Sequence, residues 1–205
     1  EFSGNRIGGL YLGVSDRDGF TPAEESTFCE LSRVVSVFVS LRNKINDDQK
    51  EIRQLQNQDM LTGLYNMEAF RRREEERIKK GELLGNVAGG EVYALVHVDV
   101  NNFSYVNENF GQQVGDSILQ EFGRMLAQEE HVVEACRMYS DFFVELVHGK
   151  SEEEVYQKVL EENRAFENRQ KLRYPASDMR LSAGICFVRD SRESFDMILE
   201  GANLA

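Results

Sequence analysis

The spacing of apolar residues changes along the first part of the chain. Apolar residues alternate with others over residues 10–14, which predicts a β-strand followed by a turn. A helix is predicted next, because Thr21 is a suitable N-cap and Pro22 suits the first helical position. Glu24, three residues after Thr21, completes a capping box. The chain therefore passes from a strand into a helix near residue 21.

The helix that begins there carries a narrow apolar stripe. Its apolar residues occupy the a and d positions of one heptad frame, which Asp48 interrupts: Leu31, Val34, Phe38, Leu41, Ile45, Ile52 and Leu55. Residues 45–58 contain no other apolar side chain, so this segment alone has no core to join. Pairing with a second copy through residues 31–55 would bury the stripe. The alternative is a solvated connector helix.

The remainder of the chain alternates helical and strand patterns. Helices are predicted over 67–81, 111–128, 151–170 and from about 194, and strands over 91–100, 131–136, 144–147 and 179–188. Asn66 is a suitable helix cap, Gly81 a helix stop, and Ser151 with Glu154 a capping box. The order α-β-α-β-β-α-β-α predicts an α+β fold of ferredoxin-like type. We expect a mainly antiparallel sheet flanked by helices, preceded by a long signalling helix.

Two carboxylates stand at strand ends in this layout. Asp99 closes the strand over 91–100, where the chain enters a segment over 100–116 that is interpreted as a loop. Asp141 lies at the tip of the hairpin between residues 131 and 147. Paired acids at adjacent strand ends can hold Mg²⁺ beside a nucleoside triphosphate. The alternative is that both are ordinary solvated turn residues, because Asp is common in turns.

The overall charge argues against some classes of partner, and the cysteines indicate the cellular location. The 205 residues carry a formal net charge of -12, which argues against nucleic-acid or anionic-membrane binding. The three cysteines are far apart and lack metal-ligand spacing, which favours a reducing, cytoplasmic location without disulfides. No apolar run is long enough to span a membrane, so no direct membrane insertion is expected of this fragment. The chain begins at Glu1 without Met, so we expect a piece of a longer protein.

Three ordered segments resemble the motifs of GGDEF domains, the diguanylate cyclase family. The segment DMLTGLYNMEAF over 59–70 is similar to the family's opening signature, and VDVNNFSYVNENFGQQVGDSIL over 98–119 is similar to its second block. The segment SAGIC over 182–186 resembles a strand near the family's end. The resemblance covers residues 59–205.

This resemblance implies a nucleotide-cyclase-like domain that binds GTP. In the family, two such domains meet and join two GTP molecules into cyclic di-GMP. Asp99 and the backbone carbonyl of Val100 would hold Mg²⁺, and Asp141 would add a metal ligand and help to deprotonate the attacking hydroxyl. Asn107 and Asp116 would read guanine, because an amide and a carboxylate complement its O6 acceptor and N–H donors.

The hairpin tip departs from the family's signature. Tyr139, Ser140, Asp141, Phe142 and Phe143 stand where Gly-Gly-Asp/Glu-Glu-Phe is expected. The two glycines of the family's signature let the backbone approach the nucleotide closely, and both are absent here. Tyr139 would fill space that a ribose or phosphate needs. Phe142 replaces the second acid, which weakens charge neutralisation during phosphoryl transfer. The signature is therefore interpreted as degenerate.

Other family positions also differ. Asn101 replaces the second Asp of the second block, and Ser104 replaces its Lys. The product-inhibition motif Arg-x-x-Asp would fall at 130–133, where Glu-His-Val-Val stands, so feedback binding of cyclic di-GMP is not expected there. The family's late phosphate-binding Lys would follow residue 205. The histidines, His97, His131 and His148, are interpreted as packing or surface residues, since none has a partner at ligand spacing.

The first residues resemble the closing strand and last helix of a GAF sensory domain. This resemblance implies three parts: the end of a GAF-like domain over 1–45, a helical coiled-coil linker over 46–58, and a GGDEF-like domain over 59–205. The helix would then transmit a signal to the output domain through a change in dimer pairing.

Three functions are compatible with these features. The first is a catalytically silent output domain of a bacterial signalling protein that still binds guanine nucleotide. The second is an active cyclase, in which Asp141 suffices. The third is a purely structural dimerisation domain.

Overall fold

The computed structural model describes residues 20–84 and 90–205. The chain divides into two compact units, one ending at Gln54 and the other running from Leu55 to Ala205. The strand expected over 10–14, which carries much of the GAF resemblance, lies outside the described residues. Each unit is described by itself below.

The long helix α1 (Pro22–Asn57) is continuous through the predicted heptad segment. The Thr21 hydroxyl accepts the Glu24 N–H at 3.3 Å, and the Glu24 carboxylate accepts the Thr21 N–H at 2.9 Å, which confirms the capping box. Six apolar residues of the predicted stripe are each more than half exposed: Leu31, Val34, Phe38, Leu41, Ile45 and Ile52. Among the described residues, no helix is both long and apolar enough to cross a membrane.

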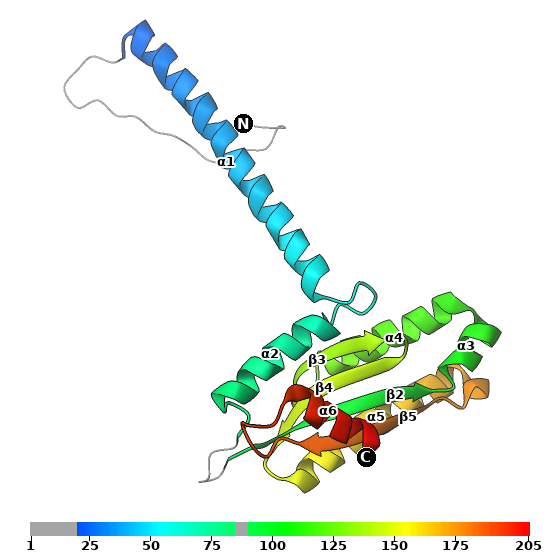
Figure 1. Ribbon diagram of the computed structural model, residues 1–205. Helices are drawn as coiled ribbons and strands as arrows, with labels where there is room; N and C mark the ends of the chain where they lie inside the picture. The colour runs from blue at the N-terminus through cyan, green and yellow to red at the C-terminus, as the bar shows by residue number, and fades with distance from the viewer. Residues whose placement is uncertain (1–19, 85–89) are drawn as a thin grey trace. The chain divides into compact units, whose positions relative to one another are not determined.

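The second unit is built on one five-stranded sheet in the order β1-β3-β4-β2-β5 (Figure 1). Its strands are β1 (Tyr65–Asn66), β2 (Val92–Asn101), β3 (Val132–Tyr139), β4 (Phe142–Gly149) and β5 (Arg180–Phe187). Its helices are α2 (Met67–Lys80), α3 (Phe103–Phe110), α4 (Gln112–Leu126), α5 (Glu152–Arg173) and α6 (Phe195–Leu204), with a 3-10 turn, η1, at Pro175–Ser177. All neighbouring strands are antiparallel except β1 and β3. The predicted α+β fold is confirmed.

The sheet separates two apolar cores because successive side chains of a strand point to opposite faces. On β2, the residues Ala94, Val96, Val98 and Val100 pack in the core shared with α4 and α5. Leu95 packs in the other core, with residues of α2 and α6. Helices cover both faces of the sheet at this central strand, which explains why both faces of β2 are apolar.

The segment over 100–116 was expected to be a loop, and that expectation is wrong. Residues 103–110 form α3, which buries Phe103 and Val106 against the core. Polar residues dominate this segment, and α3 has only about two helical turns, so its periodicity was easy to miss. Asn102 precedes α3 in the left-handed conformation, with φ 63°, and so turns the chain sharply after β2.

The caps of the other helices follow the predictions. The Asn66 side chain accepts the Ala69 N–H at 2.9 Å, and Gly81 ends α2 with φ 69°. At α5, the Ser151 hydroxyl accepts the Glu154 N–H at 3.2 Å. The Glu154 carboxylate accepts the Lys150 N–H rather than that of Ser151, so this box is shifted by one residue.

Candidate functional site at the tip of the β3–β4 hairpin

Strand pairing brings the two predicted carboxylate ligands of the metal together. Asp99 at the end of β2 is in register with Phe142 at the start of β4. The Val100 N–H donates to the carbonyl oxygen of Asp141 at 3.3 Å, so the two acids lie on neighbouring strand ends. This adjacency was expected from the element order and is present in the structure.

The charges of the two acids interact. Burial raises the pKa of Asp99, the negative charge of Asp141 raises it further, and His97 opposes the rise. A cation placed beside Asp99 and Asp141 would offset the repulsion that raises the pKa of Asp99. Mg²⁺ commonly takes one or two protein carboxylates and completes its shell with phosphates and water, so this donor set fits it. In the described parts of the chain, no third acid, histidine or cysteine joins them in a metal-binding group.

Aromatic rings occupy the hairpin tip beside these acids. The Phe142 ring lies 5.5 Å from the His97 ring and 5.0 Å from the Tyr139 ring, measured between centroids. Tyr139 remains 60% exposed, so its ring rests on Phe142 and faces solvent. Ser140 takes a left-handed conformation with φ 48°, the geometry that a glycine would adopt without strain. The turn therefore has a left-handed residue at Ser140 and is flanked by the rings of Tyr139 and Phe142.

Phe143 anchors the hairpin in the core. Its ring is fully buried and makes an edge-to-face contact with Phe122 of α4, with centroids 4.9 Å apart. This contact holds the start of β4 against α4 and so positions Asp141 two residues earlier.

The predicted guanine readers lie on two consecutive helices. Asn107 belongs to α3 and Asp116 to α4, and Gly111 separates the helices with φ 88°. The Asn107 side-chain oxygen is buried and has no hydrogen-bond partner. It points at Gly115, the residue before Asp116, where an added Cβ would lie 2.0 Å from it. The Asn107 amide therefore lies against the start of α4, the part of the helix that carries Asp116.

An arginine connects the hairpin tip with the start of the domain. Arg137 of β3 donates through Nε to the carbonyl oxygen of Ser140 at 2.7 Å. Its Nη1 lies 3.4 Å from the carboxylate of Asp59. Asp59 also accepts hydrogen bonds from the N–H and the hydroxyl of Thr62, at 2.8 and 2.7 Å. The sequence did not predict this link.

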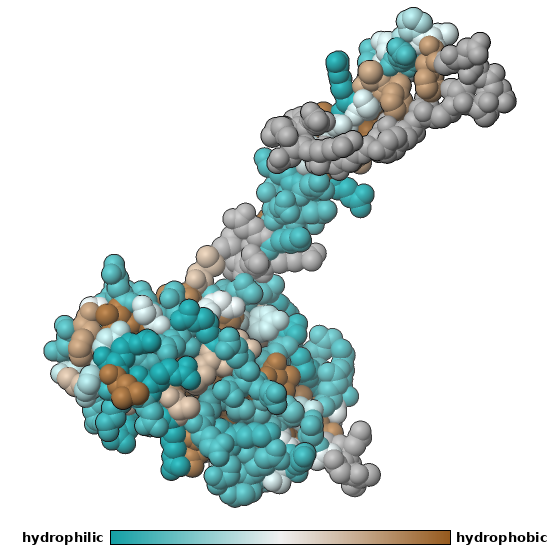
Figure 2. Space-filling model, turned by 180° about the vertical axis from the view of Figure 1, so that it is seen from behind, coloured by the Kyte–Doolittle hydropathy of each residue, from teal (hydrophilic) through white to brown (hydrophobic). Residues whose placement is uncertain are grey.

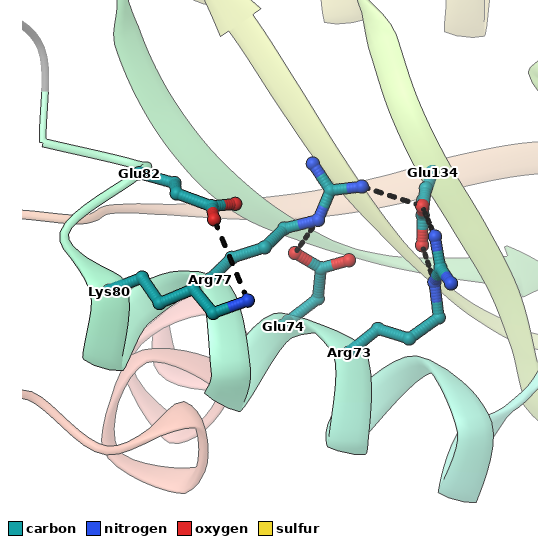
Figure 3. A network of polar contacts seen from close by, with 6 residues as sticks. All are labelled: Arg73, Glu74, Arg77, Lys80, Glu82 and Glu134. Carbon is teal, nitrogen blue, oxygen red and sulfur yellow. Dashed lines mark hydrogen bonds and ion pairs between the residues drawn. The ribbon is translucent and has the colours of Figure 1, made fainter.

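A polar network that the sequence did not predict joins α2 to β3 (Figure 3). Arg73 and Arg77 reach from α2 to the carboxylate of Glu134 on β3, the latter at 2.7 Å. Glu74 lies beside them, fully buried, with Nε of Arg77 3.6 Å from its carboxylate. Burial raises the pKa of Glu74 to about 8, although Arg77 opposes the rise, and the charge of Glu134 adds to it. A buried carboxyl that keeps its proton therefore lies next to an ion-paired one.

A second buried acidic group lies on the opposite face of the sheet. Glu145 of β4 is fully buried, and neither of its oxygens has a hydrogen-bond partner. Burial and then the charges of Glu162 and Glu129 raise its pKa well above the usual range. His131, interpreted above as a packing or surface residue, is buried, with Nε2 2.9 Å from the Glu162 carboxylate. The sequence suggested no partner for this histidine.

The surface of the second unit shows no dominant apolar patch in the view from behind (Figure 2). Hydrophilic residues cover most of it, and hydrophobic ones appear in small separate areas. On α1, the hydrophobic residues gather toward its N-terminal part.

Helices cover both faces of a mixed five-stranded sheet, a carboxylate pair lies at its strand ends, and a long helix precedes it in the chain. These features define a nucleotide-cyclase-like fold. The chain matches the family model for the "Diguanylate cyclase, GGDEF domain" over residues 56–205. It belongs to the GGDEF family.

Curated relatives share moderate identity with the chain. Diguanylate cyclase DgcN of Escherichia coli is 29% identical over 152 residues, which are 70% of this chain and 36% of that protein. Response regulator PleD of Caulobacter vibrioides is 30% identical over 87 residues, 42% of this chain and 18% of PleD. The chain therefore spans well under half of the length of these relatives.

Solved structures show the same fold. The coiled coil and GGDEF domain of DgcB from Caulobacter crescentus, crystallised with c-di-GMP, matches with a TM-score of 0.68. The identity is 20%, and the match covers 85% of this chain and 91% of that one. The GGDEF domain of FimX from Pseudomonas aeruginosa matches with a TM-score of 0.56 at 18% identity, over 72% of this chain and 90% of that one.

Proposed function

We propose that this chain is a catalytically silent GGDEF output module of a cyclic di-GMP signalling protein that retains a guanine-nucleotide site. The observation that carries this proposal is the hairpin tip, where Phe142 is in register with Asp99 and packs between His97 and Tyr139. An aromatic ring thus stands where the family's second acid is expected. Loss of charge neutralisation in phosphoryl transfer costs roughly several orders of magnitude in rate.

The retained nucleotide site would combine metal ligands at the end of β2 and in the β3–β4 turn with guanine-binding residues on α3 and α4. Asp99 and Asp141, with the carbonyl of Val100, would hold Mg²⁺, which supplies charge neutralisation at the phosphates of bound GTP. Asn107 and Asp116 would hydrogen-bond the guanine. The raised pKa of Asp99 and its position beside Asp141 support this assignment, because perturbed carboxylates on neighbouring strand ends are typical of functional sites.

The catalytic part is tested by incubating the purified chain with GTP and Mg²⁺ and separating the products chromatographically. We expect no cyclic di-GMP above background. The combined substitution Tyr139→Gly, Ser140→Gly and Phe142→Glu is expected to create measurable synthesis. Family-like synthesis by the unaltered chain would refute catalytic silence.

The binding part is tested by calorimetry of GTP with Mg²⁺. We expect the unaltered chain to bind and Asp116→Ala to bind at least about tenfold more weakly, because guanine N–H donors lose their acceptor. Glu161→Ala is the matched control, since it removes an exposed carboxylate of α5 outside the site. Equal null traces for the unaltered chain and Asp116→Ala would support a purely structural domain.

A second candidate is an active diguanylate cyclase. The observation that favours it is the preserved adjacency of Asp99 and Asp141, together with a turn backbone that still reaches the left-handed conformation at Ser140. In that case the Tyr139 side chain would rotate away from the nucleotide when GTP binds. The combined substitution described above would then raise synthesis only modestly from an already measurable rate.

We also propose that the chain forms a homodimer through the helix over residues 31–55, within a GAF-like part over 1–45 and a coiled-coil linker over 46–58. The exposed a and d residues of α1 support pairing, because a single helix leaves them in water. Sedimentation should show a dimer that Phe38→Glu dissociates. Asn43→Glu, on the opposite heptad face, should leave it intact, and a monomeric unaltered chain would refute the pairing.

A further inference from the structure

Gly115 of α4 lies directly against side chains of α3. A Cβ added to it would lie 2.0 Å from Oδ1 of Asn107 and 3.1 Å from its Cγ. The same Cβ would lie 3.1 Å from Cζ of Phe103. The contact at 2.0 Å is impossible for any side chain, but Asn107 can rotate away from it. An alanine would therefore displace the Asn107 amide without requiring the helices to separate.

The contact also selects one orientation of the Asn107 amide. Its Oδ1 is buried without a conventional hydrogen-bond partner and points at the Cα–H of Gly115. A Cα–H group is a weak donor, so it favours the amide oxygen over the amide nitrogen at this place. With Oδ1 directed at Gly115, the two N–H donors of Nδ2 are directed away from that contact.

We propose that Gly115 is a positioning residue that sets the base specificity of the nucleotide site by holding Asn107 with its amide donors outward. This inference rests on the proposed function. An outward donor at Asn107 beside an acceptor at Asp116 complements guanine, which offers O6 as an acceptor and N1–H and N2–H as donors. Adenine offers the opposite pattern, a donor at N6 and an acceptor at N1, and leaves both side chains unpaired.

The first test measures affinities for GTP and ATP with Mg²⁺ by calorimetry. The unaltered chain should prefer GTP at least about tenfold. Gly115→Ala should lower GTP affinity at least about tenfold and remove most of the preference, because the displaced amide no longer presents its donors. Wild-type affinity and preference in Gly115→Ala would overturn the proposal.

Gly123→Ala is the matched control. Gly123 is a second buried glycine of α4, and its added Cβ would meet Cβ of Thr62 at 3.0 Å, away from Asn107. This variant tests for a general effect of crowding α4. It should leave the ratio of GTP to ATP affinity unchanged, and an equal loss of preference in both variants would overturn the specific role of Gly115.

A second test does not depend on nucleotide. Thermal unfolding is measured for Gly115→Ala in the natural chain and in Asn107→Ala, where the amide is absent. The shift caused by Gly115→Ala should be more destabilising in the natural chain, because only there must an amide be displaced. Equal shifts in the two backgrounds would overturn the contact between Gly115 and Asn107.

Failure of the unaltered chain to bind GTP would overturn the proposed function and the specificity role of Gly115. The thermal unfolding measurements would then test only the contact between Gly115 and Asn107.

Discussion

Replacing Glu74 by glutamine removes an ionisable group from the buried contact between α2 and β3. Glu74 is fully buried, and its native pKa of about 8 exceeds the 4.5 of an ordinary glutamate. Between these values the folded chain holds a proton that the unfolded chain has lost. The contribution of Glu74 to the free energy of unfolding is therefore fully present below about pH 4.5, and it falls as the pH rises toward 8.

The magnitude follows from the two pKa values. Each pH unit in the window costs about 1.4 kcal/mol, and the slope halves near the native pKa. Between about pH 6 and about pH 8, Glu74 should lower the free energy of unfolding by about 2 kcal/mol. Glu74→Gln lacks this contribution and should lose correspondingly less stability over the same range.

Urea unfolding of both chains at the two pH values measures this difference. Glu76→Gln is the matched control, because Glu76 is exposed on the same helix and Lys80 lowers its pKa. It should follow the natural chain. If the natural chain and Glu74→Gln lose equal stability between the two pH values, Glu74 does not titrate there and the reasoning about its burial is wrong.

Three further substitutions test other contacts by urea unfolding. Glu145→Gln should flatten the fall in stability above neutral pH, because burial raises the pKa of this carboxyl; an unchanged slope would contradict this. Arg137→Ala should cost about 1–3 kcal/mol by removing the bonds to Asp59 and Ser140, with Arg137→Lys intermediate; a neutral effect would show that the link is not stabilising. Asn66→Ala should cost about 1 kcal/mol through loss of the α2 cap, and a cost near zero would argue against the cap.

The sequence predicted most elements of the fold because their signals are local. The pattern over 91–100 predicted the strand β2, and the caps at Thr21, Asn66 and Ser151 marked helix starts. Such signals depend on residues within a few positions of one another. The short α3 and the two-residue β1 were missed, because elements of this length carry too little periodicity.

The candidate site was predicted in part. Motif resemblance assigned Asp99 and Asp141 to metal binding and Asn107 and Asp116 to guanine recognition. The structure puts Asp99 beside Asp141 by pairing β2 with β4. The packing of Phe142 between His97 and Tyr139 could not be read from the chain, since it depends on which side chains share a face of neighbouring strands.

By itself the sequence determined the family, the order of elements and the exposed apolar stripe of α1. Only the tertiary structure decided which charged residues are buried. The segment over 71–80 is so rich in charge that it reads as a solvated helix face, yet Glu74 within it is fully buried. The reason is physical: burial depends on what packs against a residue, and the partners of Glu74 and Glu145 come from β3 and α5, distant in the chain.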